Sequence, residues 1–131
     1  MKGFIDNIEE RAEKNEDFQH VLYTGKHLQL VLMSLKPGEE IGDEVHKDRD
    51  QFFRVEKGKG QMIIDGTTHK IKSDDAIVVP AGSRHNLINT CEKPLKLYTL
   101  YGSPNHLDQL IQVTKAEASA SKESFAGVTT E

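Results

Sequence analysis

Short apolar runs alternate with turn-forming residues through the central part of the chain. The runs are rich in Val, Ile, Leu, Tyr and Phe, and Gly, Pro, Asp or Ser follows most of them. This pattern predicts strands at Leu28–Leu35, Gln51–Val55, Gln61–Ile64, His69–Lys72, Ala76–Val79, Asn86–Asn89 and Leu95–Tyr101. Asp65-Gly66 predicts a two-residue hairpin turn, because both of its positions need positive φ. No helical period of useful length interrupts residues 28–101, so we expect an all-β sandwich or barrel without βαβ units.

The two ends of the chain depart from this pattern. Residues 5–17 are charged and weakly periodic, and Asp6 or Asn7 could cap a short helix there. Residues 107–113 fit either a final strand or a helical turn. The composition of the last residues is typical of a tail that stays loose unless a partner orders it. We therefore expect an N-terminal arm over residues 1–17, a β-barrel domain over residues 18–113 and a flexible C-terminal tail over residues 114–131.

Composition and charge limit which binding partners and which cellular compartment we expect for the chain. The 131 residues suffice for one domain with its own core. There are 17 Lys and Arg against 21 Asp and Glu, a net charge of −4 without a basic stripe, so we expect neither nucleic acid nor a membrane as a partner. The single Cys91 cannot form an internal disulfide, and no run has the length of a signal peptide or a membrane span. The chain is expected to be cytoplasmic.

Two polar segments supply a set of possible metal ligands. Glu44 and His46 are two residues apart, so on a strand they would share a face. A polar turn over residues 47–50 would let Gln51 begin the next strand on that same face, and His85 follows a loop bent by Pro and Gly. Two imidazoles with one carboxylate form the facial triad of non-haem iron enzymes, and the set also suits Zn, Mn or Ni. The weaker amide ligand of Gln51 could bind the metal, or hold a coordinated water or substrate.

Ordinary roles for these and neighbouring residues remain open. Taken alone, Glu44 and His46 could be a surface pair beside a charged turn. At most one of Tyr98 and Tyr101 would line a pocket, and packing explains both, while Asn89 is expected to close backbone hydrogen bonds. The remaining histidines are most simply solvated or strand-face residues; these are His20, His27, His69 and His106.

The two segments resemble the two sequence motifs of the cupin superfamily. The first motif reads Gly, five residues, His, one residue, His, three or four residues, Glu, six residues, Gly. Residues 38–58 match its spacing, with Glu44 where the first histidine is usual and Gln51 where the glutamate is usual. The second motif reads Gly, five residues, Pro, one residue, Gly, two residues, His, three residues, Asn. Residues 80–89 match it from the proline onward, and Asp74 replaces the leading glycine.

The resemblance covers about residues 28–101 and implies a double-stranded β-helix, or jelly-roll barrel. It implies a divalent transition metal ion (Mn, Fe, Zn or Ni) held by Glu44, His46, Gln51 and His85. The two departures keep the ligand charge at −1 and both bring oxygen donors, which favours a retained site and harder ions such as Mn²⁺ or Fe²⁺.

Cupins resembling this chain include metal-dependent dioxygenases, and that is the leading expectation for its activity. A sugar or sugar-phosphate isomerase or epimerase, similar to mannose-6-phosphate isomerase, is an alternative. It is weakened because no second inward carboxylate can be assigned as a base. A non-catalytic module that binds a small ligand is a third possibility. A small-molecule ligand or substrate and a homodimer are the expected partners.

Overall fold

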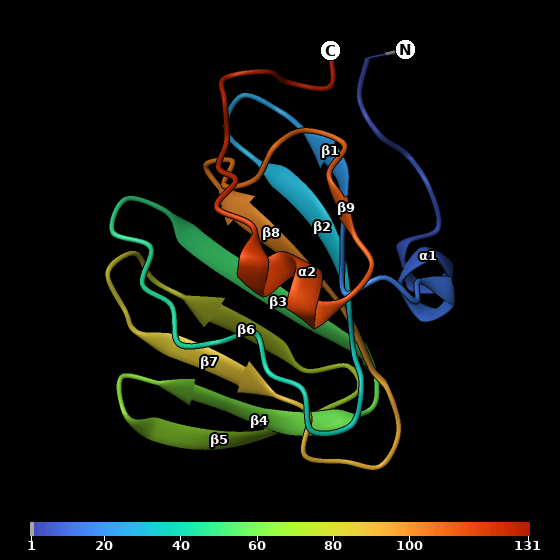
Figure 1. Cartoon of the computed structure of the whole chain (residues 1–131), viewed down its shortest axis with the longest axis vertical. Coiled ribbons are helices and arrows are strands. Elements are labelled where there is room, and N and C mark those ends of the chain that lie inside the picture. The colour runs from blue at the N-terminus through green and yellow to red at the C-terminus, as the bar shows by residue number, and fades with distance from the viewer. Residues whose placement is uncertain (1) are drawn as a thin grey trace.

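The computed structural model describes residues 2–131, in which antiparallel strands predominate (Figure 1). The elements in chain order are α1 (Ile8–Lys14), β1 (Gln19–Thr24), β2 (Gln29–Leu35), β3 (Asp50–Lys57), β4 (Lys59–Ile64), β5 (Thr67–Lys72), β6 (Ala76–Val79), β7 (His85–Ile88), β8 (Leu95–Gly102), β9 (Ile111–Gln112) and α2 (Lys115–Ala120). Within this described part of the chain, no helix is long and apolar enough to cross a membrane.

The strands form two antiparallel sheets that enclose the core. Over residues 2–131 one sheet has six strands in the order β6-β3-β8-β2-β1-β9, and the other has three in the order β5-β4-β7. Phe53 and Leu97 from the first sheet and Met62 and Leu87 from the second are fully buried in one hydrophobic cluster. The expected all-β jelly-roll barrel is confirmed.

Strand β3 shows how alternation directs side chains into this barrel. Gln51, Phe53 and Val55 are buried, whereas Phe52 and Arg54 between them are half-buried and lie on the other face. This is the orientation that the sequence pattern predicts. Gln51 therefore projects inward from the end of a strand whose next inward positions are core residues.

The expected turn, cap and buried amide lie where the sequence places them. Asp65 and Gly66 have φ values of 47° and 83° between β4 and β5, as a two-residue hairpin requires. Asn7 caps α1, and its side chain accepts a hydrogen bond from the Glu10 amide. The fully buried Asn89 donates through Nδ2 to two backbone carbonyls and accepts from one amide through Oδ1.

Two strands of the fold could not be assigned from the hydropathy pattern alone. Strand β1 was not among the predicted runs, because polar residues begin and end it; it is held by pairing with β2, where Val21 lies opposite Val31. Residues 107–113 fit either a strand or a helical turn by sequence, and the structure has a strand there, β9, which pairs with β1.

The C-terminal segment lies along the barrel in this structure. Thr114 caps α2, and its side chain accepts a hydrogen bond from the Glu117 amide. Further on, the Phe125 amide donates to Asn105 O, and residue 130 pairs with β1. Residues 114–131 therefore have defined contacts, although composition alone predicts a loose tail; the flexibility of this segment in solution stays a prediction.

Candidate metal centre

Two hydrogen-bonded loops bring the candidate ligands together at one end of the barrel. Glu44 and His46 lie in the connection between β2 and β3, so the expectation that they share a strand is wrong. The backbone of Glu44 instead pairs with that of His85 through two hydrogen bonds of 2.9 Å, in an isolated antiparallel bridge. His46 O accepts a hydrogen bond of 2.8 Å from the Gly82 amide. The candidate ligands therefore converge because the two loops pair with each other, and not because alternate residues of one strand share a face.

The proton positions on His85 and Gln51 follow from their partners. His85 Nδ1 lies 3.1 Å from Ser83 O, which can only accept, so Nδ1 carries the proton and Nε2 has a lone pair. Gln51 Nε2 donates to Thr99 Oγ1 at 2.9 Å, and that hydroxyl donates in turn to a carbonyl of β3. Gln51 Oε1 consequently faces His85 Nε2 at 3.1 Å. In a neutral ring with its proton on Nδ1, the lone pair of Nε2 and Gln51 Oε1 are both available to a cation bound beside them.

The carboxylate and the second imidazole complete the cluster. Glu44 Oε2 lies 3.2 Å from His46 Nε2, and the ring centroids of His46 and His85 are 5.5 Å apart. One ligand atom each of Glu44, His46 and His85 lies within 4.8 Å of the other two. The chain therefore has a candidate metal-binding group of two histidines and one carboxylate. This donor set fits a divalent transition metal ion.

A cavity of ≈ 270 Å³ adjoins the cluster. Glu44, Gln51 and Tyr101 line it on the side of the cluster, and Phe18, Met33 and Ile41 add apolar surface. The wall supplied by the C-terminal segment consists of Lys115, Ala118, Ser119, Ser121 and Glu123. The volume lies somewhat below the ~300 Å³ at which pockets for drug-sized ligands begin, so the cavity suits a small molecule.

The lysine in this wall is already engaged. Lys115 Nζ donates to Ile41 O at 2.9 Å and lies 5.4 Å from the ring centroid of Phe18. Glu44 and Glu123 are the carboxylates that line the cavity, and their charge makes it unfavourable for a phosphate or carboxylate group placed away from a metal.

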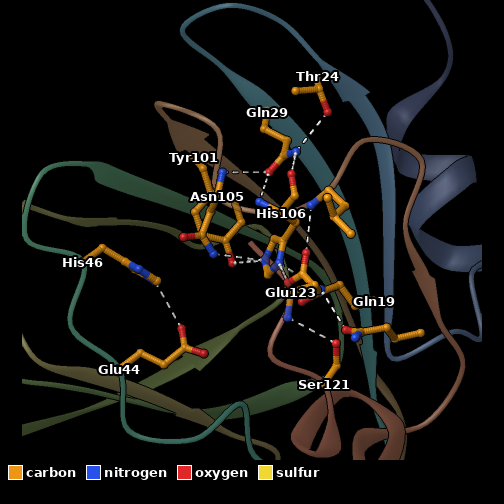
Figure 2. Close-up of polar contacts among 12 residues, drawn as sticks. Gln19, Thr24, Gln29, Glu44, His46, Tyr101, Asn105, His106, Ser121 and Glu123 are labelled. Atoms are coloured by element: carbon orange, nitrogen blue, oxygen red, sulfur yellow. Dashed lines mark hydrogen bonds and ion pairs between the residues drawn. The ribbon is translucent and has the colours of Figure 1, made fainter. Parts of the chain in front are cut away.

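A part-buried polar chain of Tyr101, His106 and Glu123 lines the cavity (Figure 2). The hydroxyl of Tyr101 lies 3.1 Å from His106 Nε2, and His106 Nδ1 lies 2.8 Å from Glu123 Oε2. The other carboxylate oxygen of Glu123 accepts from the Leu107 amide at 2.8 Å. The expectation of a solvated His106 is wrong, because the C-terminal segment covers this residue. No spacing in the sequence could have paired it with Glu123, since the path of the tail sets that contact.

Burial and these hydrogen bonds set the ionisation of the chain. Burial raises the pKa of Tyr101 far above its ordinary value, and the charge of Glu44 acts in the same direction, so the hydroxyl is protonated. Burial also tends to raise the pKa of Glu123, but the hydrogen bonds from His106 and the Leu107 amide outweigh it and leave that pKa below its ordinary value. Glu123 is accordingly a carboxylate at neutral pH.

The turn that carries His106 is fixed by the side-chain amide of Gln29, which is fully buried (Figure 2). Gln29 Nε2 donates to His106 O at 2.8 Å and to Thr24 Oγ1 at 2.9 Å. Gln29 Oε1 accepts from the amides of Asn105 and His106 at 3.0 and 2.9 Å. Both ends of the side chain are satisfied, which holds the imidazole at the cavity. Tyr101 lines the cavity, whereas Tyr98 lies beside Phe52 on the other face of the sheet.

Known proteins resemble this chain over most of its length. The uncharacterized protein YrkC of Bacillus subtilis (strain 168) is 44% identical over 128 residues, covering 93% of this chain and 69% of YrkC. The crystal structure of BH2720 from Bacillus halodurans superposes with a TM-score of 0.90 and 41% identity, covering 92% of this chain and 96% of that one. Quercetin 2,3-dioxygenase of B. subtilis (strain 168) is 32% identical over 89 residues, covering 67% of this chain and 26% of the enzyme.

The family profile described as Cupin domain matches residues 31–101, the stretch that holds both loops of the candidate metal centre. Together with the barrel and the relatives, this match shows that the chain belongs to the cupin family.

Proposed function

We propose that this cupin binds a divalent transition metal ion through Glu44, His46, Gln51 and His85, and that it is a metal-dependent dioxygenase acting on a small molecule. The observation that carries the metal site is the grouping of Glu44, His46 and His85, with one ligand atom of each within 4.8 Å of the other two. Gln51 Oε1 lies 3.1 Å from His85 Nε2 and would add an oxygen donor to this set, whose formal charge is −1. Such a set suits Mn, Fe, Zn or Ni, with Mn²⁺ and Fe²⁺ favoured by its oxygen donors.

The protein around the centre is built to orient a small ligand. A bound ion with a 2-His-1-carboxylate set would offer open coordination positions to the substrate and to O₂. Ser83 and Thr99 fix the His85 ring and the Gln51 amide before any ligand arrives. The apolar side chains of Phe18 and Met33 would exclude water from one side of the cavity. The 32% identity with an enzyme named quercetin 2,3-dioxygenase supports this reaction class.

One observation favours the alternative of an isomerase or epimerase. The sequence offered no second inward carboxylate, but Glu123 lines the cavity that adjoins the cluster. A carboxylate in that position is the kind of group that moves a proton to or from carbon in such reactions. Its hydrogen bonds to His106 and Leu107 would have to loosen first, so the dioxygenase remains the leading proposal. A module that binds a ligand without turnover is the remaining alternative.

Elemental analysis of the purified chain tests the metal site directly. We expect a near-stoichiometric transition metal in the wild type and its loss in the variant that combines His46→Ala with His85→Ala. A matched variant, His69→Ala, changes an exposed histidine on β5 and should keep the metal. No metal in the wild type, and no uptake on anaerobic reconstitution, would refute the site.

Turnover assays then separate the three activities. The Fe²⁺- or Mn²⁺-loaded protein should consume oxygen with a panel of small enols, diketones and flavonols. Conversion of sugars or sugar phosphates without oxygen uptake would support the isomerase instead. Ligand binding without either reaction would support the non-catalytic module.

A homodimer in the cytoplasm completes the proposal. The six-stranded sheet ends at the two-residue strand β9, where Ile111 and the following Val113 are 47% and 56% exposed. An apolar edge of this kind is stabilised when a second copy covers it. Light scattering after size exclusion should give twice the mass of 14.7 kDa, and a monomer would refute the dimer.

A further inference from the structure

Two buried glutamine side chains line the cavity from neighbouring strands. Gln19 begins β1 and lies directly opposite Gln112 of β9, so the two side chains share one face of the sheet. Gln19 is 5% exposed and Gln112 is 4% exposed, and both line the cavity. Figure 2 shows Gln19 on the side of Glu123, away from His46. The two glutamines thus form a polar part of the cavity that is separate from the candidate metal ligands.

The hydrogen bonds of this glutamine pair leave one amide oxygen and one NH₂ group without a partner. Gln19 Nε2 donates to Gln112 Oε1 at 3.1 Å, which joins the two atoms that face each other. Gln19 Oε1 and Gln112 Nε2 make no hydrogen bond within residues 2–131. Rotation of both amides by 180° would exchange these roles and would still leave one oxygen and one NH₂ group. A ligand can therefore meet both an acceptor and a donor here.

His106 does not take up the remaining capacity of the pair. Gln19 Nε2 lies 3.3 Å from His106 Nδ1, but that nitrogen gives its proton to Glu123 Oε2 at 2.8 Å and has no lone pair with which to accept. A buried amide that lacks hydrogen bonds costs free energy, and native proteins contain few of them. The unused groups point to a bound partner, because ligand pockets carry a few polar groups that orient the ligand.

The charges around the cavity select a neutral ligand group. Glu44 and Glu123 both line the cavity, and their carboxylates would repel another anion there. Lys115 Nζ, which lies on the same wall, already donates to Ile41 O at 2.9 Å. A carboxylate or phosphate would therefore find no unengaged Lys or Arg among the described residues that line this space. A neutral amide would meet a partner for its oxygen and a partner for its N–H.

We propose that Gln19 and Gln112 are specificity-determining residues that bind a neutral carboxamide or lactam group of the substrate. The carbonyl of the ligand accepts from the NH₂ group of one glutamine, and the N–H of the ligand donates to the oxygen of the other. This inference deepens the proposed function by naming the substrate class. It rests on that function only in taking this cavity as the place where the substrate binds.

Matched small molecules test the glutamine pair on the full chain with a chelator present, so that no metal ion takes part. 2-Pyrrolidinone is a lactam, and cyclopentanone has a similar ring and carbonyl but no N–H. Acetamide and acetate have almost the same size and differ in charge. Proton–nitrogen NMR spectra report the side-chain NH₂ signals of Gln19 and Gln112, which are assigned by their loss in Gln19→Leu and Gln112→Leu.

The lactam and acetamide should shift the NH₂ signals of both glutamines. For ligands this small we expect Kd values of about 1–10 mM. Cyclopentanone should bind about 10-fold more weakly than the lactam, because it leaves the amide oxygen of one glutamine without a donor. Acetate should bind about 10-fold more weakly than acetamide, because it lacks the N–H and brings a charge that the carboxylates repel.

Leucine variants test which residues carry the binding. Leucine is close to glutamine in size and removes both polar atoms, so Gln19→Leu and Gln112→Leu should each weaken 2-pyrrolidinone binding about 10-fold. Gln61→Leu is the matched control, since it changes a half-buried glutamine of β4 that does not line this cavity, and it should leave the Kd unchanged. Melting temperatures show whether each variant is folded, and the comparison of ligands in the wild type does not depend on them.

The outcomes separate this inference from the metal site. If 2-pyrrolidinone at about 100 mM shifts neither NH₂ signal, or if cyclopentanone binds equally well, the amide site is refuted, while a metal-loaded wild type would still support the dioxygenase. Equal affinity in folded Gln19→Leu and Gln112→Leu, or an equal loss in Gln61→Leu, would refute it too. If the lactam binds as expected but the chain takes up no metal, the amide site stands and the metal site fails.

Discussion

Metal binding should stabilise the folded chain, and His85→Ala should remove that effect. An ion that binds only the folded state at a hundred times its dissociation constant adds about 2.7 kcal/mol to the free energy of unfolding. For 131 residues, an unfolding entropy of about 2.1 cal/mol/K per residue converts this into a rise in melting temperature of about 10 °C. We expect a rise of that size when Mn²⁺ or Fe²⁺ is added to metal-free wild type.

The structure indicates that His85→Ala also lowers the stability of the metal-free chain. The side chain is 1% exposed and its ring lies 6.1 Å from that of Phe53, so its removal leaves a small void and Ser83 O without its donor. A loss of about 1–3 kcal/mol is expected from these causes. Each variant must therefore be compared with itself, with and without metal.

Scanning calorimetry with and without the ion separates the two effects. His85→Ala should begin at a lower melting temperature and rise little or not at all with metal. His69→Ala, on the exposed strand β5, should behave as the wild type does in both respects. An equal rise in wild type and His85→Ala would show that the ion binds elsewhere and would refute the assignment.

Three further predictions concern residues that support the barrel and its C-terminal segment. Asn89→Ala leaves two carbonyls and one amide without partners inside the protein and should cost about 2–5 kcal/mol in urea unfolding; a loss below the error of that measurement would contradict it. Gly60→Ala would place a methyl carbon 2.4 Å from Ile88 O, so we expect a lower melting temperature or insoluble protein, whereas unchanged melting would contradict the packing. The pKa of Glu123 is lower in the folded chain than in the unfolded chain, so its carboxylate adds to the free energy of unfolding at pH values above the unfolded pKa of about 4.3. This contribution is lost as the pH falls through the lower pKa of the folded chain. The free energy of urea unfolding, measured between pH 3 and 7, should therefore fall less toward acid pH in Glu123→Gln than in the wild type. An identical pH dependence of the two proteins would show that the pair with His106 contributes nothing.

Most strands could be predicted because alternation within a strand is a local property. Phe53 and Val55 point inward and Arg54 outward because successive side chains take opposite faces of any strand. The same reasoning failed for Glu44 and His46, which lie in a loop. Alternation says nothing about a loop whose conformation is set by pairing with another part of the chain.

The spacing of polar residues nevertheless predicted that Glu44, His46 and His85 would lie close together, as they do. Gly and Pro bend the loop before His85, and the turn before β3 ends next to Gln51, so both side chains start from elements that meet at one end of the barrel. When two side chains lie at the ends of neighbouring elements of the barrel, the sequence is enough to predict that they come close together. Asn89 was predicted for a similar reason, since a buried amide at a strand end closes backbone bonds.

By itself, the sequence determined the β-strands, the tight turns and the residue types available to bind a metal ion, because these depend on neighbours a few positions apart. Tertiary structure alone decided how those groups are oriented and which polar residues line the cavity beside them. His106 and Glu123 meet because the tail returns over the barrel after β9, and Tyr101 reaches them from β8. No local pattern encodes such a contact, since it depends on the path of the whole chain around its core.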